Sequence, residues 1–536
     1  MRRPEKGTEF WVELLSLTRI PWNADNGAYK RCREIARATG GMGMEGWTGD
    51  DWAIARRELP LATAVFEKVR SLRARFYVPG HQGVGFDPLG DRWGSAFLDD
   101  LTELEGLDNL AVPSGAIAEA QILAAQTFGA DQSWFLVNGS TVGLQAALLA
   151  VSRINPSDRQ KIIIGRNAHQ SILTGLVLSG LEPAWVQPEI NDVWAIATHV
   201  TPEAIAQALD ANPDTCAVCI VSPTYYGTTS DVGAIADYCH QRGIPLIVDE
   251  AHGGHFMAHP DLPQSALAAG ADIVIQSAHK TLGSLTQSAF LHWQGSTDSL
   301  KTLKTSLGDS LRLLQSSSPS YLLMTSLDVA RSHLQKHGHG DWQRALNLAR
   351  DLRDRLDQMP KFIVLQHRHQ DPTRVVISGT ALGWSGYALD DYLDSQGIAV
   401  EIGDPGAIGL VITPQTQPNA IQMLVQTLRS LPPAPDTLDV STLQSQSLSA
   451  FSEMVLTPRE AWFSPKQAIA IDDAMGQICA EWICPYPPGI PILMPGEKIT
   501  TDTLDYLKTI WAIGGELSGV SDSEFQTIQV IETCPK

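Results

Sequence analysis

The sequence predicts an α/β fold built on a mainly parallel sheet with helices on both faces. Apolar runs of strand length recur from about residue 61 to about residue 334. These runs are Trp134–Val137, Lys161–Ile164, Cys216–Val221, Ile244–Val248, Asp272–Ile275 and Ser288–His292. Most neighbouring runs are separated by stretches with apolar residues at helical spacing. Strands that alternate with helices in this way build βαβ units and a parallel sheet.

The helical stretches carry start and stop signals. They are Ile117–Phe128, Val142–Val151, a segment opened by Thr201-Pro202-Glu203, and Asp231–Arg242. Thr201 is a capping residue, and Pro202 falls in the first turn, where the helix needs no N–H from it. Gly243 directly follows Arg242 and is a normal helix stop.

The rest of the chain predicts further parts around this large domain. We expect an N-terminal arm over residues 1–60, a large domain over 61–335, a small α+β domain over 336–435, and a linker with a C-terminal domain over 436–536. The tryptophans of this segment favour an arm buried on a partner subunit, and a poorly ordered extension is the alternative. The elements expected after the large sheet are a helix from about Asp328 to Met359, strands at Phe362–Leu365, Arg374–Ser378, Ala399–Ile402 and Gly409–Ile412, and a helix-like stretch at Pro465–Ala480.

Composition is that of an ordinary globular protein and excludes several partners. The 536 residues are 43% hydrophobic and 18% charged, with a formal net charge of -20. Nucleic acids and anionic membranes bind clustered positive charge, so neither is an expected partner. We find no signal peptide and no membrane-spanning run, and we expect a cytoplasmic protein. The 7 cysteines favour a reducing compartment, with Cys216 and Cys219 buried in a strand.

A lysine and an acid close two consecutive apolar strands. Asp249 follows Ile244–Val248, and Lys280 follows Asp272–Ile275 in the sequence Ser-Ala-His-Lys. Ligands of open α/β sheets bind beyond the carboxyl ends of the strands. A lysine there can hold an aldehyde as a Schiff base, and an acid can keep a pyridine nitrogen protonated. The pair therefore predicts a site for pyridoxal 5'-phosphate (PLP).

Other polar residues come after the same strand ends. Ser140 and Thr141 open a helix after Trp134–Val137, and free N–H groups with the helix dipole can hold a phosphate there; an ordinary helix cap is the alternative. His169 follows the next strand and could stack on a flat ring or simply cap a helix. The remaining polar residues of this edge are His252, Ser277 and His279.

Taken in order, these residues resemble the PLP-dependent ornithine/lysine/arginine decarboxylases of the aspartate-aminotransferase fold (fold type I). The resemblance runs from about Leu61 to the C-terminus. The motifs that carry it are Tyr77-Val78-Pro79-Gly80-His81-Gln82-Gly83, Asp100–Leu110, Phe135–Thr141, Arg166–Ser171, Pro223–Gly227, Asp249–His255, Ser277–Thr281, Cys484–Pro491 and Pro495-Gly496-Glu497.

The resemblance implies a role for each residue. Lys280 would carry the cofactor and Asp249 would bind its pyridine nitrogen, with His169 on the ring. The phosphate and cofactor contacts would come from Ser140, Thr141, His252, Ser277, His279 and Ser317. Ser317 would reach the phosphate of the neighbouring subunit, which implies a homodimer or a larger homo-oligomer. Gln170 and Gln82 replace lysines that are usual in the family.

The expected reaction is decarboxylation of lysine, arginine or ornithine to the corresponding amine and CO2, a step of polyamine metabolism. Two alternatives stay open: an aminotransferase of the same fold, with Arg374 as a carboxylate clamp, and a non-catalytic PLP-binding protein. The substrate is not fixed, and Glu401 and Asp404 are only guesses for the acid that would bind its side chain. No metal site is expected: His337 and His339, like His367 and His369, are taken as solvated surface.

Overall fold

The computed structural model describes residues 49–88, 92–155, 160–191, 194, 196–295, 298–434, 452–486 and 489–532. It divides into two compact units, residues 1–58 and 59–536, of which the first contributes only the helix α3 (Gly49–Glu58) to the described part. Most of the predicted arm and of the predicted linker therefore lies outside the described residues. All the remaining elements belong to the second unit.

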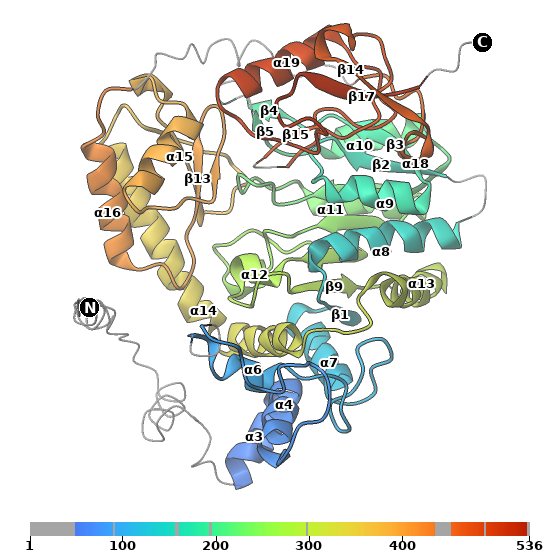
Figure 1. The fold of residues 1–536 in the computed structure, drawn as a ribbon, viewed down its shortest axis with the longest axis vertical. Helices are drawn as coiled ribbons and strands as arrows, with labels where there is room; N and C mark the ends of the chain where they lie inside the picture. The colour runs from blue at the N-terminus through green and yellow to red at the C-terminus, as the bar shows by residue number, and fades with distance from the viewer. Residues whose placement is uncertain are drawn as a thin grey trace, which may run out of the picture. The chain divides into compact units, whose positions relative to one another are not determined.

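A seven-stranded sheet forms the centre of this unit (Figure 1). Its order is β1-β9-β8-β7-β6-β2-β3, and β9 runs antiparallel to both of its neighbours while the other pairs are parallel. The strands are β1 (Gln132–Leu136), β2 (Lys161–Gly165), β3 (Glu182–Val186), β6 (Thr215–Val221), β7 (Leu246–Asp249), β8 (Ile273–Gln276) and β9 (Ala289–Trp293). The predicted α/β class with a mainly parallel sheet is confirmed.

Helices cover the two faces of the sheet and bury alternate residues of each strand. Ile247 and Ile273 pack into one core with α8, α9 and α13, whereas Val248 and Val274 pack into the other with α7 and α11. The helices are α7 (Ala116–Phe128), α8 (Gly139–Ile154), α9 (Ser171–Ser179), α10 (Pro202–Ala211), α11 (Val232–His240) and α13 (Asp298–Leu314). Burial on both faces explains why the central strands read as continuous apolar runs.

The edge strand β3, beside β2, is not predicted from the sequence. Glu182-Pro183 at its start breaks the apolar pattern, and a proline argues against a central strand. At the edge of a sheet the missing N–H has no partner to lose, so Pro183 fits opposite Ile162.

A second sheet, of four antiparallel strands in the order β10-β11-β13-β12, matches the predicted small α+β part. Its elements are β10 (Ile363–Val364), β11 (Arg374–Ser378), β12 (Ile402–Gly403), β13 (Ile408–Val411), α15 (Gly386–Ser395) and α16 (Pro418–Arg429). The long helix α14 (Tyr321–Asp357) begins earlier than expected. Its first half packs in the core of the large sheet and its last turns pack in the core of the small one.

The prediction of a helix at Pro465–Ala480 is wrong. This stretch holds β14 (Lys466–Ala470), which pairs with β17 (Thr527–Ile531), and a short 3₁₀ turn, η3 (Ile471–Asp473). The partner strand lies about sixty residues further on, and a local pattern carries no information about such a long-range ladder. The remaining elements are α4 (Pro60–Ser71), α6 (Ala96–Asp99), β4 (Ile190–Asn191), β5 (Ile196–Ala197), η1 (Phe256–Ala258), α12 (Ala278–Thr281), η2 (Thr380–Leu382), α18 (Pro458–Phe463), β15 (Cys484–Pro485), α19 (Thr501–Ala512) and β16 (Leu517–Ser518).

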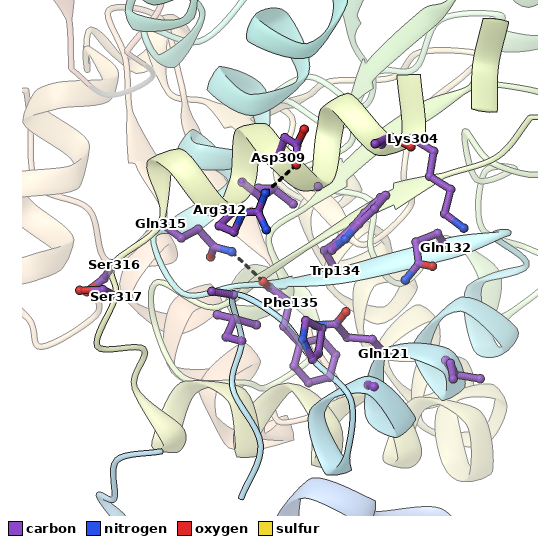
Figure 2. Close-up of a pocket in the computed structure, with 18 residues that line it drawn as sticks. Gln121, Gln132, Trp134, Phe135, Lys304, Asp309, Arg312, Gln315, Ser316 and Ser317 are labelled. Carbon is purple, nitrogen blue, oxygen red and sulfur yellow. Dashed lines mark hydrogen bonds and ion pairs between the residues drawn. The ribbon is translucent and has the colours of Figure 1, made fainter. Parts of the chain in front are cut away.

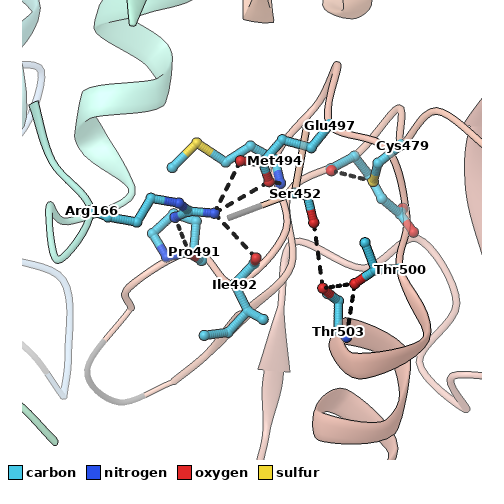
Figure 3. A network of polar contacts seen from close by, with 10 residues as sticks. Arg166, Ser452, Cys479, Pro491, Ile492, Met494, Glu497, Thr500 and Thr503 are labelled. Carbon is cyan, nitrogen blue, oxygen red and sulfur yellow. Dashed lines mark hydrogen bonds and ion pairs between the residues drawn. The ribbon is translucent and has the colours of Figure 1, made fainter. Parts of the chain in front are cut away.

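A buried ion pair ties the C-terminal part to the end of β2 (Figure 3). The guanidinium of Arg166 lies 3.2 Å from the carboxylate of Glu497, and the two side chains are 9% and 0% exposed. Arg166 also donates to the backbone oxygens of Pro491 and Ile492. Glu497 accepts a further hydrogen bond from the backbone N–H of Met494 at 2.8 Å. The pair is hydrogen-bonded across two parts of the chain, so removing one partner leaves a buried charge.

We expect Arg166→Met to destabilise the protein by about 3–5 kcal/mol, because Glu497 would stay buried without its cation. Chemical denaturation with tryptophan fluorescence as the signal measures the change. Arg459→Met is the matched control: Arg459 also crosses to this region, donating to the backbone oxygens of Val177 and Leu178, but its side-chain contacts are exposed. Equal losses in the two variants would contradict the assignment of stability to the buried pair.

Candidate active site

The parallel pairing of β7 and β8 brings the predicted acid and lysine to the same edge. Asp249 is the last residue of β7 and lies opposite Ile275 of β8. Ser277 follows β8 and begins the one-turn helix α12, which carries Lys280. The charge of Lys280 acts on Asp249 and the charge of Asp249 acts on Lys280. The two residues thus form one electrostatic pair.

Burial shifts the pKa of both residues in the direction that favours the neutral form. The attraction between the two charges opposes this shift. Burial raises the pKa of the Asp249 carboxyl, while the Lys280 charge and the N–H of Ala251 lower it. Burial lowers the pKa of the Lys280 amine, while Asp249 raises it. Asp249 is 5% exposed, and its Oδ1 accepts from the backbone of Ala251 at 3.1 Å. A cation placed against this carboxylate would hold it ionised.

A histidine and an arginine extend this pair into a row. The Nε2 atom of His252 lies 2.8 Å from Lys280 Nζ, and its Nδ1 atom lies 2.8 Å from a guanidinium nitrogen of Arg374. The ring of Tyr225 lies 4.5 Å from the ring of His252 and 5.6 Å from Lys280 Nζ. Arg374 comes from β11 of the small sheet. The site therefore draws side chains from both sheets.

From the sequence, Arg374 is expected only as a possible carboxylate clamp. Its place in this row depends on a close contact with Gly227. Gly227 has a φ of +85°, and a Cβ on it would come within 2.6 Å of the Cβ of Arg374. The backbone oxygen of Gly227 accepts from the N–H of Asp371 at 2.8 Å. Only glycine accepts both the backbone angle and the close approach, so Gly227 seats Arg374 against the large domain.

Two of the elements that carry the residues predicted to hold a phosphate contact the turn just before β9. Ser140 and Thr141 lie in the first turn of α8, whose first residue, Gly139, donates to the backbone oxygen of Gln287 at 2.8 Å. His279 donates from Nδ1 to the backbone oxygen of Ser288 at 3.0 Å. The hydroxyl of Ser277 is buried and has no hydrogen-bond partner. A helix N-terminus and an unsatisfied buried hydroxyl each suit an anion.

His169 lies between the large domain and the C-terminal part. Its Nδ1 accepts from the backbone N–H of Ser171 at 3.2 Å. Burial, and then the Lys280 charge, lowers the pKa of His169 to about 4, so the ring is neutral at pH 7. A Cβ on Gly489 would stand 3.4 Å from its Nε2, and the Gly489 oxygen accepts from the N–H of Gln170 at 3.0 Å. The C-terminal part thus packs against the imidazole ring of His169 through Gly489.

Ser317 lies apart from this cluster in its own chain. It is exposed, in the loop between α13 and α14, at the rim of a cavity of about 480 Å³ (Figure 2). Gln315 fixes this loop by accepting from the N–H of Val137 at 3.0 Å, and the N–H of Ser316 donates to the Asn138 side chain at 3.2 Å. The loop is therefore anchored beside the start of α8, with Ser317 exposed at the surface.

No group of three or more His, Cys, Asp or Glu residues that could hold a metal occurs among the described residues. His333 instead pairs with Asp341 near His337, and His367 is bonded to the backbone oxygen of His369. In the described part of the chain, no helix has the length and apolar character needed to cross a membrane. Cys216 and Cys219 are buried in β6, as predicted.

The residues at this edge fit PLP. A neutral flat ring, a lysine that interacts with a buried carboxylate, an unsatisfied buried hydroxyl and a helix N-terminus match an aldehyde-bearing pyridine with a phosphate. Fold and site together define a PLP-dependent enzyme of the aminotransferase-like class.

Comparison with known proteins gives the family. Residues 59–370 match the Orn/Lys/Arg decarboxylase major domain and residues 441–530 match the C-terminal domain of the same family. The chain belongs to the Orn/Lys/Arg decarboxylases and is a PLP-dependent carboxy-lyase acting on a basic amino acid.

Two relatives and one structure illustrate the match. The chain is 36% identical to an arginine decarboxylase of Bacillus subtilis (89% of this chain and 99% of the relative) and 24% identical to the constitutive lysine decarboxylase of Escherichia coli (86% and 78%). The structure of the Escherichia coli constitutive lysine decarboxylase aligns with a TM-score of 0.75 at 20% identity, covering 99% of this chain and 95% of the other. That alignment supports the fold.

Proposed function

We propose that this decarboxylase acts on arginine and releases agmatine. The proposal rests on the exposed carboxylate of Glu401. This residue directly precedes β12 in the small domain, and its charge acts on Tyr225 and Lys280. A carboxylate there can accept two parallel hydrogen bonds from a guanidinium, the strongest pairing available to either group. The greater identity to an arginine than to a lysine decarboxylase supports the same choice.

The second acid considered, Asp404, is used by the fold itself. Its Oδ1 accepts from the backbone N–H groups of Gly406 and Ala407, each at 2.7 Å. Burial raises the pKa of Asp404, these bonds oppose the rise, and the resulting pKa is about 6. We therefore assign substrate recognition to Glu401.

We propose that each polar residue of the edge has its own role at the cofactor. Lys280 carries it, Asp249 binds the pyridine nitrogen and His169 lies on the ring. The further contacts are made by Ser140, Thr141, His252, Ser277 and His279. When bound, PLP supplies an electron sink for the pair left by departing CO2. The unpartnered Ser277 hydroxyl and the neutral ring of His169 support these assignments.

The chain supplies orientation and proton control. Asp249 holds a proton on the ring nitrogen by charge, because opposite charges attract strongly in a buried site. Glu401 fixes the distal end of the substrate, which sets how the carboxylate stands relative to the ring. Lys280 Nζ and His252 Nε2, 2.8 Å apart, are the groups to which we assign proton transfer at the reacting carbon. Proton delivery to that carbon completes an amine, whereas removal of its hydrogen would lead to transamination.

We further propose a homodimer in which Ser317 reaches the cofactor phosphate of the partner subunit. The exposure of Ser317 and its anchored loop support this. We also propose the division into an arm (1–60), a large domain (61–335), a small domain (336–435) and a linker with a C-terminal domain (436–536), which the two family matches support.

We expect purified protein to release agmatine and CO2 from arginine faster than it releases amine from lysine or ornithine. Glu401→Gln should lower kcat/KM for arginine by on the order of 10-fold to 10²-fold, mainly through KM, because a charged hydrogen bond is lost. Glu203→Gln, an exposed change on α10, is the control. Preference for lysine or ornithine would overturn the substrate assignment, and keto-acid formation in place of CO2 would indicate the aminotransferase.

We expect Asp249→Asn to keep the cofactor attached, with normal visible absorbance, but to lose on the order of 10²-fold or more in kcat. The amide cannot hold the pyridine proton by charge. Lys280→Ala should abolish both turnover and the absorbance. Asp272→Asn removes another buried carboxylate, at the opposite end of β8, and should leave kcat near that of the wild type. A normal kcat in Asp249→Asn would assign the ring nitrogen to another acid.

We expect the cofactor-loaded protein to sediment as a dimer or larger assembly. Ser317→Ala should weaken cofactor retention without dissociating the assembly, whereas Ser318→Ala, in the same exposed loop, should do neither. Sedimentation equilibrium and cofactor release on dilution measure these outcomes. An active, cofactor-loaded monomer would contradict the shared site.

A further inference from the structure

The row Arg374–His252–Lys280 has only one consistent arrangement of protons. A guanidinium carries N–H donors and has no acceptor, so Arg374 must donate to Nδ1 of His252, at 2.8 Å. Nδ1 therefore bears no proton. The ring must then be the neutral tautomer with its proton on Nε2, since a doubly protonated ring could not accept this bond.

The same reasoning extends to the lysine. The Nε2–H of His252 points along the 2.8 Å contact to Lys280 Nζ. A donor facing an ammonium group would make no hydrogen bond, because –NH₃⁺ has no lone pair. The contact is satisfied only if Nζ accepts, which requires the free amine. The tautomer of His252 and the protonation state of Lys280 are thus linked.

We propose that Arg374 is a positioning residue that fixes the tautomer of His252 and thereby holds Lys280 as the neutral amine that cofactor attachment requires. The proposal concerns the family reaction and does not depend on which basic amino acid is the substrate. Arg374 is 2% exposed and His252 is 4% exposed, so water does not compete for these bonds.

Arg374 is held in place by its surroundings. Its Cβ and Cγ lie against Gly227, and its backbone N–H donates to the oxygen of Asp371 at 3.1 Å. The Asp371 and Glu401 carboxylates keep the buried guanidinium charged by opposing its desolvation. The side chain therefore presents a fixed donor to His252.

The charged groups around Lys280 shift its pKa in both directions. Burial lowers the pKa of Lys280; Asp249 and Glu401 raise it, and Arg374 lowers it. Burial, and then the Lys280 and Arg374 charges, lowers the pKa of His252, which agrees with a neutral ring. The other titratable groups facing the lysine are His169, His279 and Tyr225.

Cofactor attachment reports the protonation state directly. The lone pair of Nζ attacks the aldehyde carbon, a carbon–nitrogen double bond forms, and the two amine hydrogens leave with the aldehyde oxygen as water. An ammonium group cannot begin this reaction. The rate of attachment to full-length protein freed of cofactor with hydroxylamine therefore rises with pH as Lys280 loses its proton, and it requires no turnover.

We expect Arg374→Met and His252→Leu each to move the inflection of this rate–pH profile upward by about one pH unit, so that attachment at neutral pH becomes roughly tenfold slower. The inflection of the double variant should shift no further than that of either single variant, because both changes remove the same chain of hydrogen bonds. Arg374→Lys, which keeps a donor and a charge, should restore the profile. Arg368→Met, the same change at an exposed arginine of the small domain, should leave it unchanged.

Three results would overturn the proposal. The first is an unshifted inflection in Arg374→Met. The second is a shift in Arg374→Met together with none in His252→Leu, which would mean that the arginine acts through its charge alone. The third is additive shifts in the double variant. Folding is verified by circular dichroism, and Arg374→Lys keeps the test decisive if Arg374→Met is unstable.

Discussion

The burial of Asp249 and Lys280 at one edge of the sheet is the constraint around which this site is built. Burial raises the pKa of the Asp249 carboxyl and lowers that of the Lys280 amine, and each group opposes this shift in the other. The sheet makes this possible because parallel strands bring all their carboxyl ends to one edge. The start of α8, the loop of His252 and the helix of Lys280 then need only short connections to reach the same edge.

The other parts of the chain complete the edge. The small-sheet part contributes Arg374 from β11 and Glu401 from just before β12, and both act on Tyr225. The C-terminal part contributes no charged group to the row but supports His169 through Gly489, and the Arg166–Glu497 pair fastens that part three residues before His169. Stability and ring position are thereby linked through one short segment after β2.

Sequence alone located the residues at the strand ends. Lys280, Asp249 and Ser277 could be placed because an apolar run predicts where a buried strand stops, and the residues directly after such a run must lie at the edge of the sheet. The partners supplied by other elements could not be placed in this way: Arg374 comes more than a hundred residues after His252, and only the packing of two sheets brings them together. The failure at Lys466–Ala470 has the same cause, since its ladder partner β17 is distant in sequence. β3 is not predicted because it begins with Glu182-Pro183, and a proline is tolerated in an edge strand but not in a central one.

The helix α14 has a mechanical consequence. Its 37 residues correspond to about 55 Å of continuous helix, anchored in the large core at one end and in the small core at the other. A helix passes a displacement along its length more directly than a loop does. A shift of the small sheet would therefore be felt toward the N-terminal end of α14, where Ser320 caps the helix just after the Ser317 loop. The core that carries Arg374 and the surface loop of Ser317 are in this way joined by one helix.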